Sequence, residues 1–175
     1  MSVIETELEG VFVLEPDIFG DERGFFFESF NKKKFKTETG HDLEFVQDNH
    51  SKSAHGILRG MHYQIENVQE KLVRVISGEV FDVAVDLRKS SPNFGKWVGE
   101  ILSEENKKQL FVPKGFAHGF VVTSQEAEVL YKTTNFYAPA AERCLNWNCP
   151  EVGIEWPVDM PILNERDANA PNLSD

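Results

Sequence analysis

Short apolar runs separated by turn residues extend along most of the chain and limit the folds open to it. The clearest is KLVRVISGEVFDVAVDLR, residues 71–88, in which apolar and polar residues alternate after Ser77 and Gly78. A period of two is typical of a strand with one buried face, and the intervening turn predicts a hairpin. Similar runs include GVFVLEP, LEFVQDNHS, QLFVPKG and AEVLYKTTNFY, without alternating helical patterns. The sequence therefore predicts an all-β sandwich or barrel.

Helical patterns are few and short. NKKKFKTETG predicts a helix that has Asn31 as its N-cap and ends at Gly40, and SEENKKQ predicts a single turn opened by Ser103. The segment from Trp156 onward contains three prolines, so we expect it to be irregular and to pack over the sheets. Because the 175 residues show no linker or repeat, we predict one domain, residues 1–175.

Composition and charge argue against several classes of function. The net charge is −11, whereas a nucleic-acid surface needs clustered Lys and Arg, so no nucleic-acid partner is expected. No apolar run reaches the roughly 18 residues of a membrane span, and the acidic start MSVIETELEG is unlike a signal peptide. We therefore predict a cytoplasmic protein with no membrane partner. Cys144 and Cys149 lack the spacing of a redox pair or zinc site, which predicts two reduced thiols.

The segment LRGMHYQ, residues 58–64, places a histidine within a predicted strand. A double-stranded β-helix with polar interior side chains suggests a cupin, whose metal sites usually offer HxH, a carboxylate and a later histidine. Here Gln64 replaces the second histidine after His62, and the later histidine would be His118. An amide is a poor ligand for iron, nickel or zinc, and Lys71 brings positive charge beside the available Glu70. The sequence therefore predicts no metal and no other cofactor.

His62 is instead a candidate for moving protons, a role that suits histidine near neutral pH. Such a base needs a carboxylate to fix its tautomer, and Asp167, Asp82 and Asp86 are candidates that the sequence leaves open. A lone histidine on a strand is more often a hydrogen-bonded core residue. However, polar residues recur within or beside apolar strands, as in DERGFF, FVQDNHS, EKLVRV and VPKGFAHGF. Burying so many without partners would be costly, which favours a functional interior.

Together these motifs resemble the dTDP-4-dehydrorhamnose 3,5-epimerase family over nearly the whole chain. The resemblance rests on GVFVLEPDIFGDERGFFFESF, RGMHYQ, KLVRVISGEVFDVAVDLRKSSPNFGKW, LSEENKKQLFVPKGFAHGF, LYKTTNFYAP and NERD. It implies a cupin-type jelly roll, a homodimer with exchanged N-terminal strands, no metal, and a dTDP-linked 4-keto-6-deoxyhexose as substrate. The implied reaction converts dTDP-4-dehydro-6-deoxy-D-glucose to dTDP-4-dehydro-L-rhamnose, for dTDP-L-rhamnose biosynthesis, by inverting the two carbons that flank the carbonyl.

The resemblance also implies roles for individual residues. His62 would be the base with Asp167 as its partner, Tyr131 would be the acid on the opposite side of the sugar ring, and Lys71 would lie near the carbonyl oxygen. The family usually has lysine where Arg166 stands, which keeps the charge but changes the donor geometry. The residues matching substrate-binding positions are Arg23, Arg59 and Arg166 for the diphosphate or sugar, Tyr137 for the thymine ring, and Glu28, Gln47, Asp48, Asn49, His118 and Glu142 for other contacts.

Several points remain open from the sequence. Strict alternation would send Arg59 and His62 to opposite faces of a strand, so either Gly60 marks a β-bulge or Arg59 reaches round the strand end.

Other functions in view are a single-site nucleotide-sugar epimerase, a 3,4-ketoisomerase, a non-catalytic sugar-nucleotide-binding cupin, and a metal-dependent dioxygenase or isomerase. Tyr131 argues against the ketoisomerase, because an acid on the opposite face suits inversion. Nucleotide preference, the glycan that receives the product and assembly beyond a dimer are not determined.

Overall fold

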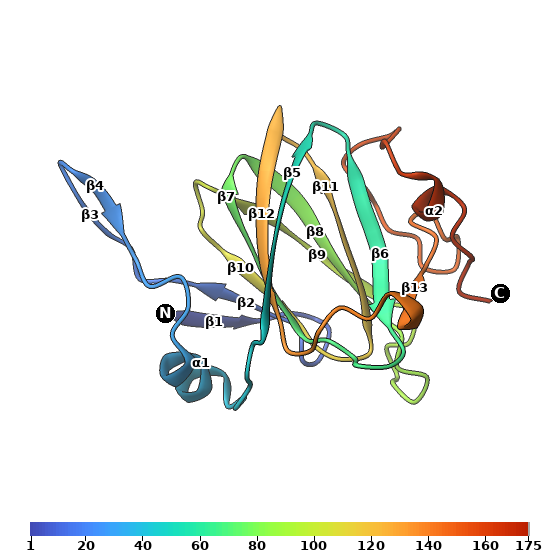
Figure 1. Ribbon diagram of the computed structural model, residues 1–175, viewed down its shortest axis with the longest axis horizontal. Coiled ribbons are helices and arrows are strands. Elements are labelled where there is room, and N and C mark those ends of the chain that lie inside the picture. The colour runs from blue at the N-terminus through green and yellow to red at the C-terminus, as the bar shows by residue number, and fades with distance from the viewer. Residues whose placement is uncertain (175) are drawn as a thin grey trace.

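The computed structural model describes residues 1–174, and two antiparallel sheets packed face to face form its centre (Figure 1). The six-stranded sheet contains, in spatial order, β1 (Ser2–Glu5), β2 (Phe12–Glu15), β10 (Gln109–Val112), β7 (Lys71–Ser77), β12 (Glu126–Thr133) and β5 (Gln47–Ala54). The five-stranded sheet contains β13 (Glu142–Cys144), β6 (Leu58–Gln64), β11 (Phe116–Val122), β8 (Glu79–Asp86) and β9 (Trp97–Ser103). This arrangement confirms the predicted all-β jelly roll.

The segment 71–88 does not form a hairpin, which corrects the sequence prediction. Although β7 and β8 follow each other in the chain, β7 pairs with β10 and β12 whereas β8 pairs with β11 and β9. Gly78 between them has a φ of +75°, and a Cβ there would lie 2.0 Å from the carbonyl oxygen of Glu126. The tight turn therefore carries the chain across from one sheet to the other, and only glycine fits at this corner.

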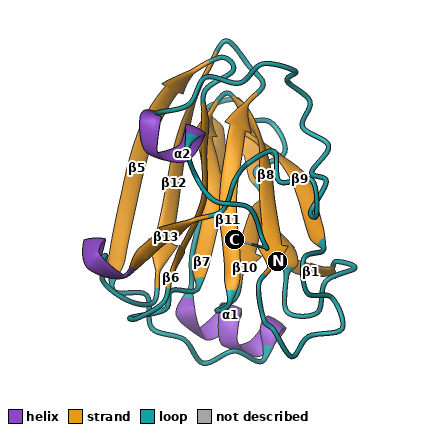
Figure 2. Cartoon of the chain, turned by 90° about the vertical axis from the view of Figure 1, so that its right-hand side faces the viewer, coloured by secondary structure: helices purple, strands orange, loops and turns teal. Residues whose placement is uncertain are grey.

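β8 is more deeply buried than its alternating sequence predicts. Its last five residues are all buried, because a different part of the protein covers each face. Val80 and Ala84 belong to the core between the sheets, whereas Val83 packs against Leu145 and Ile154. Figure 2 shows the C-terminal segment lying over this side of the five-stranded sheet. The expectation that the tail packs over the sheets is confirmed.

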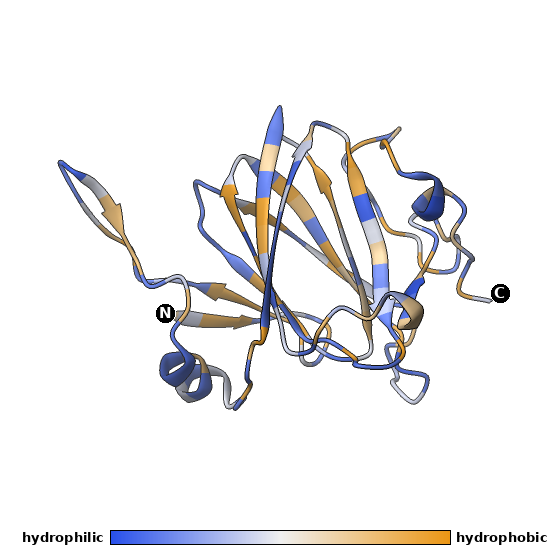
Figure 3. Ribbon diagram, in the orientation of Figure 1, coloured by the Kyte–Doolittle hydropathy of each residue, from blue (hydrophilic) through white to orange (hydrophobic). Residues whose placement is uncertain are grey.

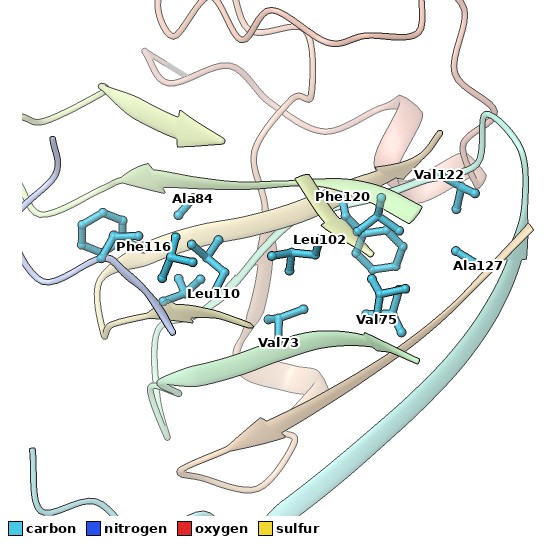
Figure 4. Packing of buried hydrophobic residues seen from close by; sticks show 14 of the residues in the cluster. Val73, Val75, Ala84, Leu102, Leu110, Phe116, Phe120, Val122 and Ala127 are labelled. Atoms are coloured by element: carbon cyan, nitrogen blue, oxygen red, sulfur yellow. The ribbon is translucent and has the colours of Figure 1, made fainter. Parts of the chain in front are cut away.

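The main apolar core fills the space between the two sheets (Figure 4). Val73 and Leu110 enter it from the six-stranded sheet, and Leu102 and Phe120 enter it from the five-stranded sheet, each at most 3% exposed. Burial of such side chains contributes about 25 cal/mol per Å² of apolar surface. Tyr131 packs against the edge of this cluster, where the core gives way to polar side chains.

The predicted helix is confirmed as α1 (Lys32–Thr39). Asn31 caps its start by accepting a hydrogen bond from the N–H of the third helical residue, and Gly40 ends it in the left-handed conformation. The predicted turn after Ser103 is also present, since the Asn106 N–H donates to Ser103 Oγ at 3.0 Å. The tail is less irregular than expected because it contains a second short helix, α2 (Glu165–Ala168), and a 3₁₀ turn, Pro139–Ala141, precedes it in the chain.

A small hairpin, β3 (Phe19–Asp21) with β4 (Gly24–Phe26), projects away from both sheets (Figure 1). Phe19, Phe25 and Phe26 are each more than 60% exposed on it. Hydrophobic residues on this projecting element are visible in Figure 3. None of the helices in residues 1–174 has the length and apolar character needed to cross a bilayer.

Candidate active site

A cavity of about 290 Å³ lies between the sheets at the polar side of the core. Lys71 and Tyr131 line it from the six-stranded sheet, and Arg59, His62 and His118 line it from the five-stranded sheet. A ligand in this cavity would therefore lie between an amine and a phenol on one wall and a guanidinium and two imidazoles on the other. The cavity continues into an adjoining opening that adds the predicted site residues Gln47, Tyr137, Glu142 and Arg166 to the lining.

A β-bulge at Gly60 brings Arg59 and His62 to the same wall. His62 pairs with His118, and Arg59 pairs with Phe120. Three residue steps along β6 therefore lie opposite only two along β11. Gly60 has a φ of +138°, and a Cβ there would lie 2.5 Å from the Gly119 Cα. Of the two arrangements considered from the sequence, the bulge is confirmed, and it requires glycine.

His62 is paired with Asp167, as the resemblance implied. His62 Nε2 lies 2.8 Å from Asp167 Oδ1, and the Gly60 N–H donates to Oδ2 at 3.2 Å. Asp167 is buried on α2, where its own N–H donates to the N-cap Asn164 at 2.8 Å. Burial opposes ionisation of Asp167, but the hydrogen bonds from His62 and Gly60 outweigh it and lower the carboxyl pKa. The carboxylate therefore holds the ring proton on Nε2 and leaves Nδ1 as the free base.

The other two candidate carboxylates have partners of their own. Asp82 is buried and lies 2.9 Å from His118 Nε2, while Asp86 accepts from Arg88 and Ser91. Burial lowers the pKa of His118, and Asp82 only partly opposes that shift. Asp167 is thus the carboxylate that orients His62, and a second histidine–aspartate pair supports the neighbouring part of the same wall.

Tyr131 and Lys71 come from the sheet that faces the His62 wall. Burial raises the pKa of Tyr131, so its phenol keeps its proton at neutral pH. Burial lowers the pKa of Lys71 to about 8, although two nearby carboxylates oppose the shift. At pH 7 Lys71 is mostly an ammonium ion with little hydration, and such a cation interacts strongly with negative charge that forms beside it.

Polar side chains at the mouth of the cavity form a network of hydrogen bonds and an ion pair. Tyr137 Oη donates to Glu142 Oε2 at 2.8 Å, and Arg166 forms an ion pair with the same carboxylate. Gln47 accepts from the Tyr137 N–H at 3.0 Å and donates to Asn49 at 2.9 Å. Burial opposes ionisation of Glu142, but Arg166 and Tyr137 outweigh it and lower the pKa of the carboxyl. The Tyr137 residue itself is 51% exposed and accessible to a ligand.

Three residues predicted to contact the ligand lie away from this cavity. Arg23 is exposed on the β3–β4 hairpin and forms an ion pair with an aspartate two residues earlier. Glu28 pairs with Lys34 near α1. Strand alternation turns Asp48 to the outer face of β5, where it pairs with Lys132 at 2.9 Å. The fold of one chain therefore assembles the predicted set without these three residues.

Sequence reasoning missed three residues at the site. Ser51 Oγ is buried without a hydrogen-bond partner and lines the cavity, and its period-two spacing from Asn49 could have revealed it. Asn164 also lines the cavity, and its position before ERDA is a recognisable N-cap signal. Cys144 had no such signal, because only the pairing of β13 with β6 places it opposite His62. Burial raises the pKa of the Cys144 thiol to about 11, so it is protonated at neutral pH.

The fold and this cavity define a cupin-type jelly roll with a ligand site between its sheets. A family model described as dTDP-4-dehydrorhamnose 3,5-epimerase matches residues 5–175. The relative of that description from Shigella flexneri is 59% identical, over 100% of this chain and 97% of the relative. The chain belongs to the dTDP-4-dehydrorhamnose 3,5-epimerase family, and it is an isomerase.

Solved structures agree with this assignment. The dTDP-6-deoxy-D-glucose-3,5-epimerase of Legionella pneumophila, in complex with dTDP-4-keto-L-rhamnose, is 49% identical with a TM-score of 0.97, over 99% of this chain and 93% of that one. A 3'-monoepimerase from Streptomyces bikiniensis, in complex with dTDP-quinovose, is 36% identical with a TM-score of 0.92, over 98% and 87% of the two chains. The same fold thus occurs in enzymes that invert different numbers of carbons.

Proposed function

We propose that the chain epimerises dTDP-4-dehydro-6-deoxy-D-glucose at carbons 3 and 5 to dTDP-4-dehydro-L-rhamnose, a step in dTDP-L-rhamnose biosynthesis. The observation that carries the proposal is the His62–Asp167 pair on one wall of the cavity and the Tyr131 phenol on the facing wall. Inversion needs a base on one face of the sugar and an acid on the other. The dTDP-4-keto-L-rhamnose bound by the Legionella relative supports the choice of substrate.

The proposed reaction uses the carbonyl at carbon 4 to acidify its two neighbours. His62 Nδ1 removes a proton from carbon 3 or carbon 5, and the electron pair moves onto the carbonyl oxygen as an enolate. The Lys71 ammonium stabilises that charge. Tyr131 then donates its proton to the opposite face as the carbonyl re-forms, leaving an imidazolium and a phenolate that return to their starting states by proton exchange. Each positioned acid or base contributes roughly 10² to 10⁴ in rate.

Arg59 and Arg166 are proposed to hold the diphosphate. Arg59 lines the cavity and is oriented by a hydrogen bond from its Nε to Ser53 Oγ at 2.9 Å. Guanidinium groups suit phosphate oxygens because they donate in pairs, which accounts for an anionic ligand in a protein of net charge −11. The half-exposed Tyr137 is proposed to stack on thymine. The remaining proposed ligand contacts are Gln47, Asn49, His118 and Glu142, with Asp48 placed less favourably on the outer face.

We also propose a homodimer in which the N-terminal strands are exchanged. The β3–β4 hairpin projects with exposed phenylalanines, and β5 leaves one edge of the six-stranded sheet unpaired within residues 1–174. A hairpin placed against the partner's edge strand would cover both surfaces and would bring Arg23 and Glu28 towards the partner's cavity. Deleting the residues before Gly24 should therefore weaken both assembly and ligand binding. Sedimentation of the truncated chain as a fully active dimer would contradict this.

Two further expectations accompany the proposal. Residues 1–175 are expected to unfold as one domain, because the strands of both sheets share the core around Val73 and Phe120. A single cooperative transition by two independent probes would be the expected result. A cytoplasmic location stays a prediction.

The decisive experiment follows the protons. Metal-stripped protein is incubated with the proposed substrate in D₂O, and deuterium is located by NMR, with His62→Ala as the control. Deuterium at both carbons, lost in the variant, is the expected result. Deuterium at one carbon only would indicate a single-site epimerase, which the similarity to the Streptomyces 3'-monoepimerase makes the second candidate. Tight binding without any exchange would indicate a non-catalytic sugar-nucleotide-binding protein.

A further inference from the structure

A thiol lies beside the His62–Asp167 pair, although the proposed acid–base chemistry does not use it. His62, Cys144 and Asp167 place a ring nitrogen, a thiol sulfur and a carboxylate oxygen within 4.8 Å of one another. We propose that these three residues form an inhibitory Zn²⁺ site, in which the metal captures the nitrogen that Asp167 normally holds. The site is distinct from the metal set considered from the sequence, because it uses neither Gln64 nor His118.

The backbone brings the three donors together from separate elements. Cys144 on β13 lies directly opposite His62 on β6 in the strand register. Asp167 reaches both from α2, with its Oδ1 at 2.8 Å from His62 Nε2 and 3.9 Å from Cys144 Sγ. Tetrahedral zinc with bonds of about 2.0–2.3 Å separates such ligand atoms by about 3.3–3.6 Å. The two distances to Asp167 lie on either side of these values, and the ring nitrogen and the sulfur lie within 4.8 Å of each other, so shifts of up to about one ångström, mainly by the thiol, complete the geometry.

The donor types suit zinc better than magnesium or calcium. Imidazole, thiolate and carboxylate are the three side-chain ligands that zinc prefers, and three protein ligands leave a fourth position for water. Zinc binding would release the thiol proton of Cys144. Arg166 Nη2 lies 3.2 Å from His62 Nε2, so the guanidinium must withdraw from the nitrogen, and its existing ion pair with Glu142 offers a nearby position.

Capture of Nε2 would stop His62 from acting as a base. The hydrogen bond to Asp167 holds the ring proton on Nε2 and leaves Nδ1 free. Zinc on Nε2 would shift that proton to Nδ1, so the ring remains neutral but can no longer accept a proton there. Inhibition in this form rests on the proposed function, whereas binding of the metal does not.

Cobalt(II) is a direct probe of binding, because a thiolate ligand gives it a charge-transfer absorption band. We expect the band in the untagged protein and in the control variant Cys149→Ser. The Cys149 thiol is buried and contacts Glu151 at 3.0 Å rather than any of the three proposed ligands. Cys144→Ser should lack the band, and zinc should abolish it in the other two proteins. His62→Asn serves as a second ligand variant and should also lose or strongly weaken it.

Inhibition is measured by zinc titration of the deuterium exchange reaction. For each protein, zinc inhibition is expressed relative to its own metal-free activity, and the half-inhibiting zinc concentration of Cys144→Ser should be about 10- to 100-fold higher or more, since even outer partners of metal ligands are worth that much. Equal zinc sensitivity in the protein and in Cys144→Ser would overturn the proposal. Absence of the cobalt band, or its loss only in Cys149→Ser, would also overturn it. A Cys144-dependent band in a protein that catalyses no exchange would instead refute the proposed function and support the site.

Discussion

Replacing Lys71 with methionine is expected to stabilise the fold while it removes most of the activity. Lys71 is buried, and burial lowers its pKa from 10.5 to about 8. At 1.36 kcal/mol per pH unit, the difference between 10.5 and 8 means that keeping the ammonium charged costs the folded state about 3 kcal/mol at pH 7. Methionine has a similar length, carries no charge and adapts to irregular spaces, so it should recover most of that cost.

The stability gain should depend on pH. Below about pH 8 Lys71 is protonated in both the folded and the unfolded chain, so the full cost is present. Between about 8 and 10.5 the unfolded chain binds more protons at this group than the folded chain, so the unmodified protein gains stability relative to Lys71→Met as pH rises. The advantage of the variant should therefore shrink from about 3 kcal/mol at pH 7 towards the packing difference alone near pH 10.5.

Denaturant unfolding at one protein concentration, measured at pH 7, 9 and 10, tests this reasoning. Lys33→Met is the matched control, because Lys33 is exposed on α1 and its replacement should change stability by no more than about 0.5 kcal/mol. Loss of the cation beside the enolate should lower kcat about 10²- to 10³-fold in Lys71→Met. A Lys71→Met protein no more stable than the original at pH 7, or an advantage unchanged from pH 7 to 10, would refute the argument.

Three other variants and one pH profile give further tests. Asp167→Asn should lower kcat by about 10²-fold or more with little change in KM, because it removes the orientation of the base but no substrate contact. Tyr137→Ala should raise KM roughly 5- to 150-fold, corresponding to about 1–3 kcal/mol of base stacking, and an unchanged KM would remove this residue from the thymine site. Gly60→Ala should fail to fold, as judged by circular dichroism, since its Cβ would meet the Gly119 Cα at 2.5 Å. Activity should fall as pH rises through about 8, where Lys71 loses its charge, and Lys71→Arg should move that decline to higher pH.

Local chemistry in the sequence determined the elements of this fold. Alternating apolar residues predicted the strands, and Asn31 and Gly40 set the ends of α1 by capping that needs no distant partner. The same local signals suggested that Gly60 interrupts its strand. The motif resemblance predicted roles for His62, Tyr131 and Lys71, and the fold places all three around one cavity.

Only the tertiary structure decided which elements meet. Period-two alternation indicates which side of a strand is buried, but it does not say which strands pair. For this reason the sequence predicted a hairpin at Gly78, where the chain in fact crosses from one sheet to the other. It could not choose among three aspartates for His62, because Asp167 is 105 residues away and is brought there by α2. Nor could it reveal Cys144 opposite the base. These contacts depend on strand register and on the packing of the C-terminal segment, whereas the sequence pattern records only each residue's local preference for burial.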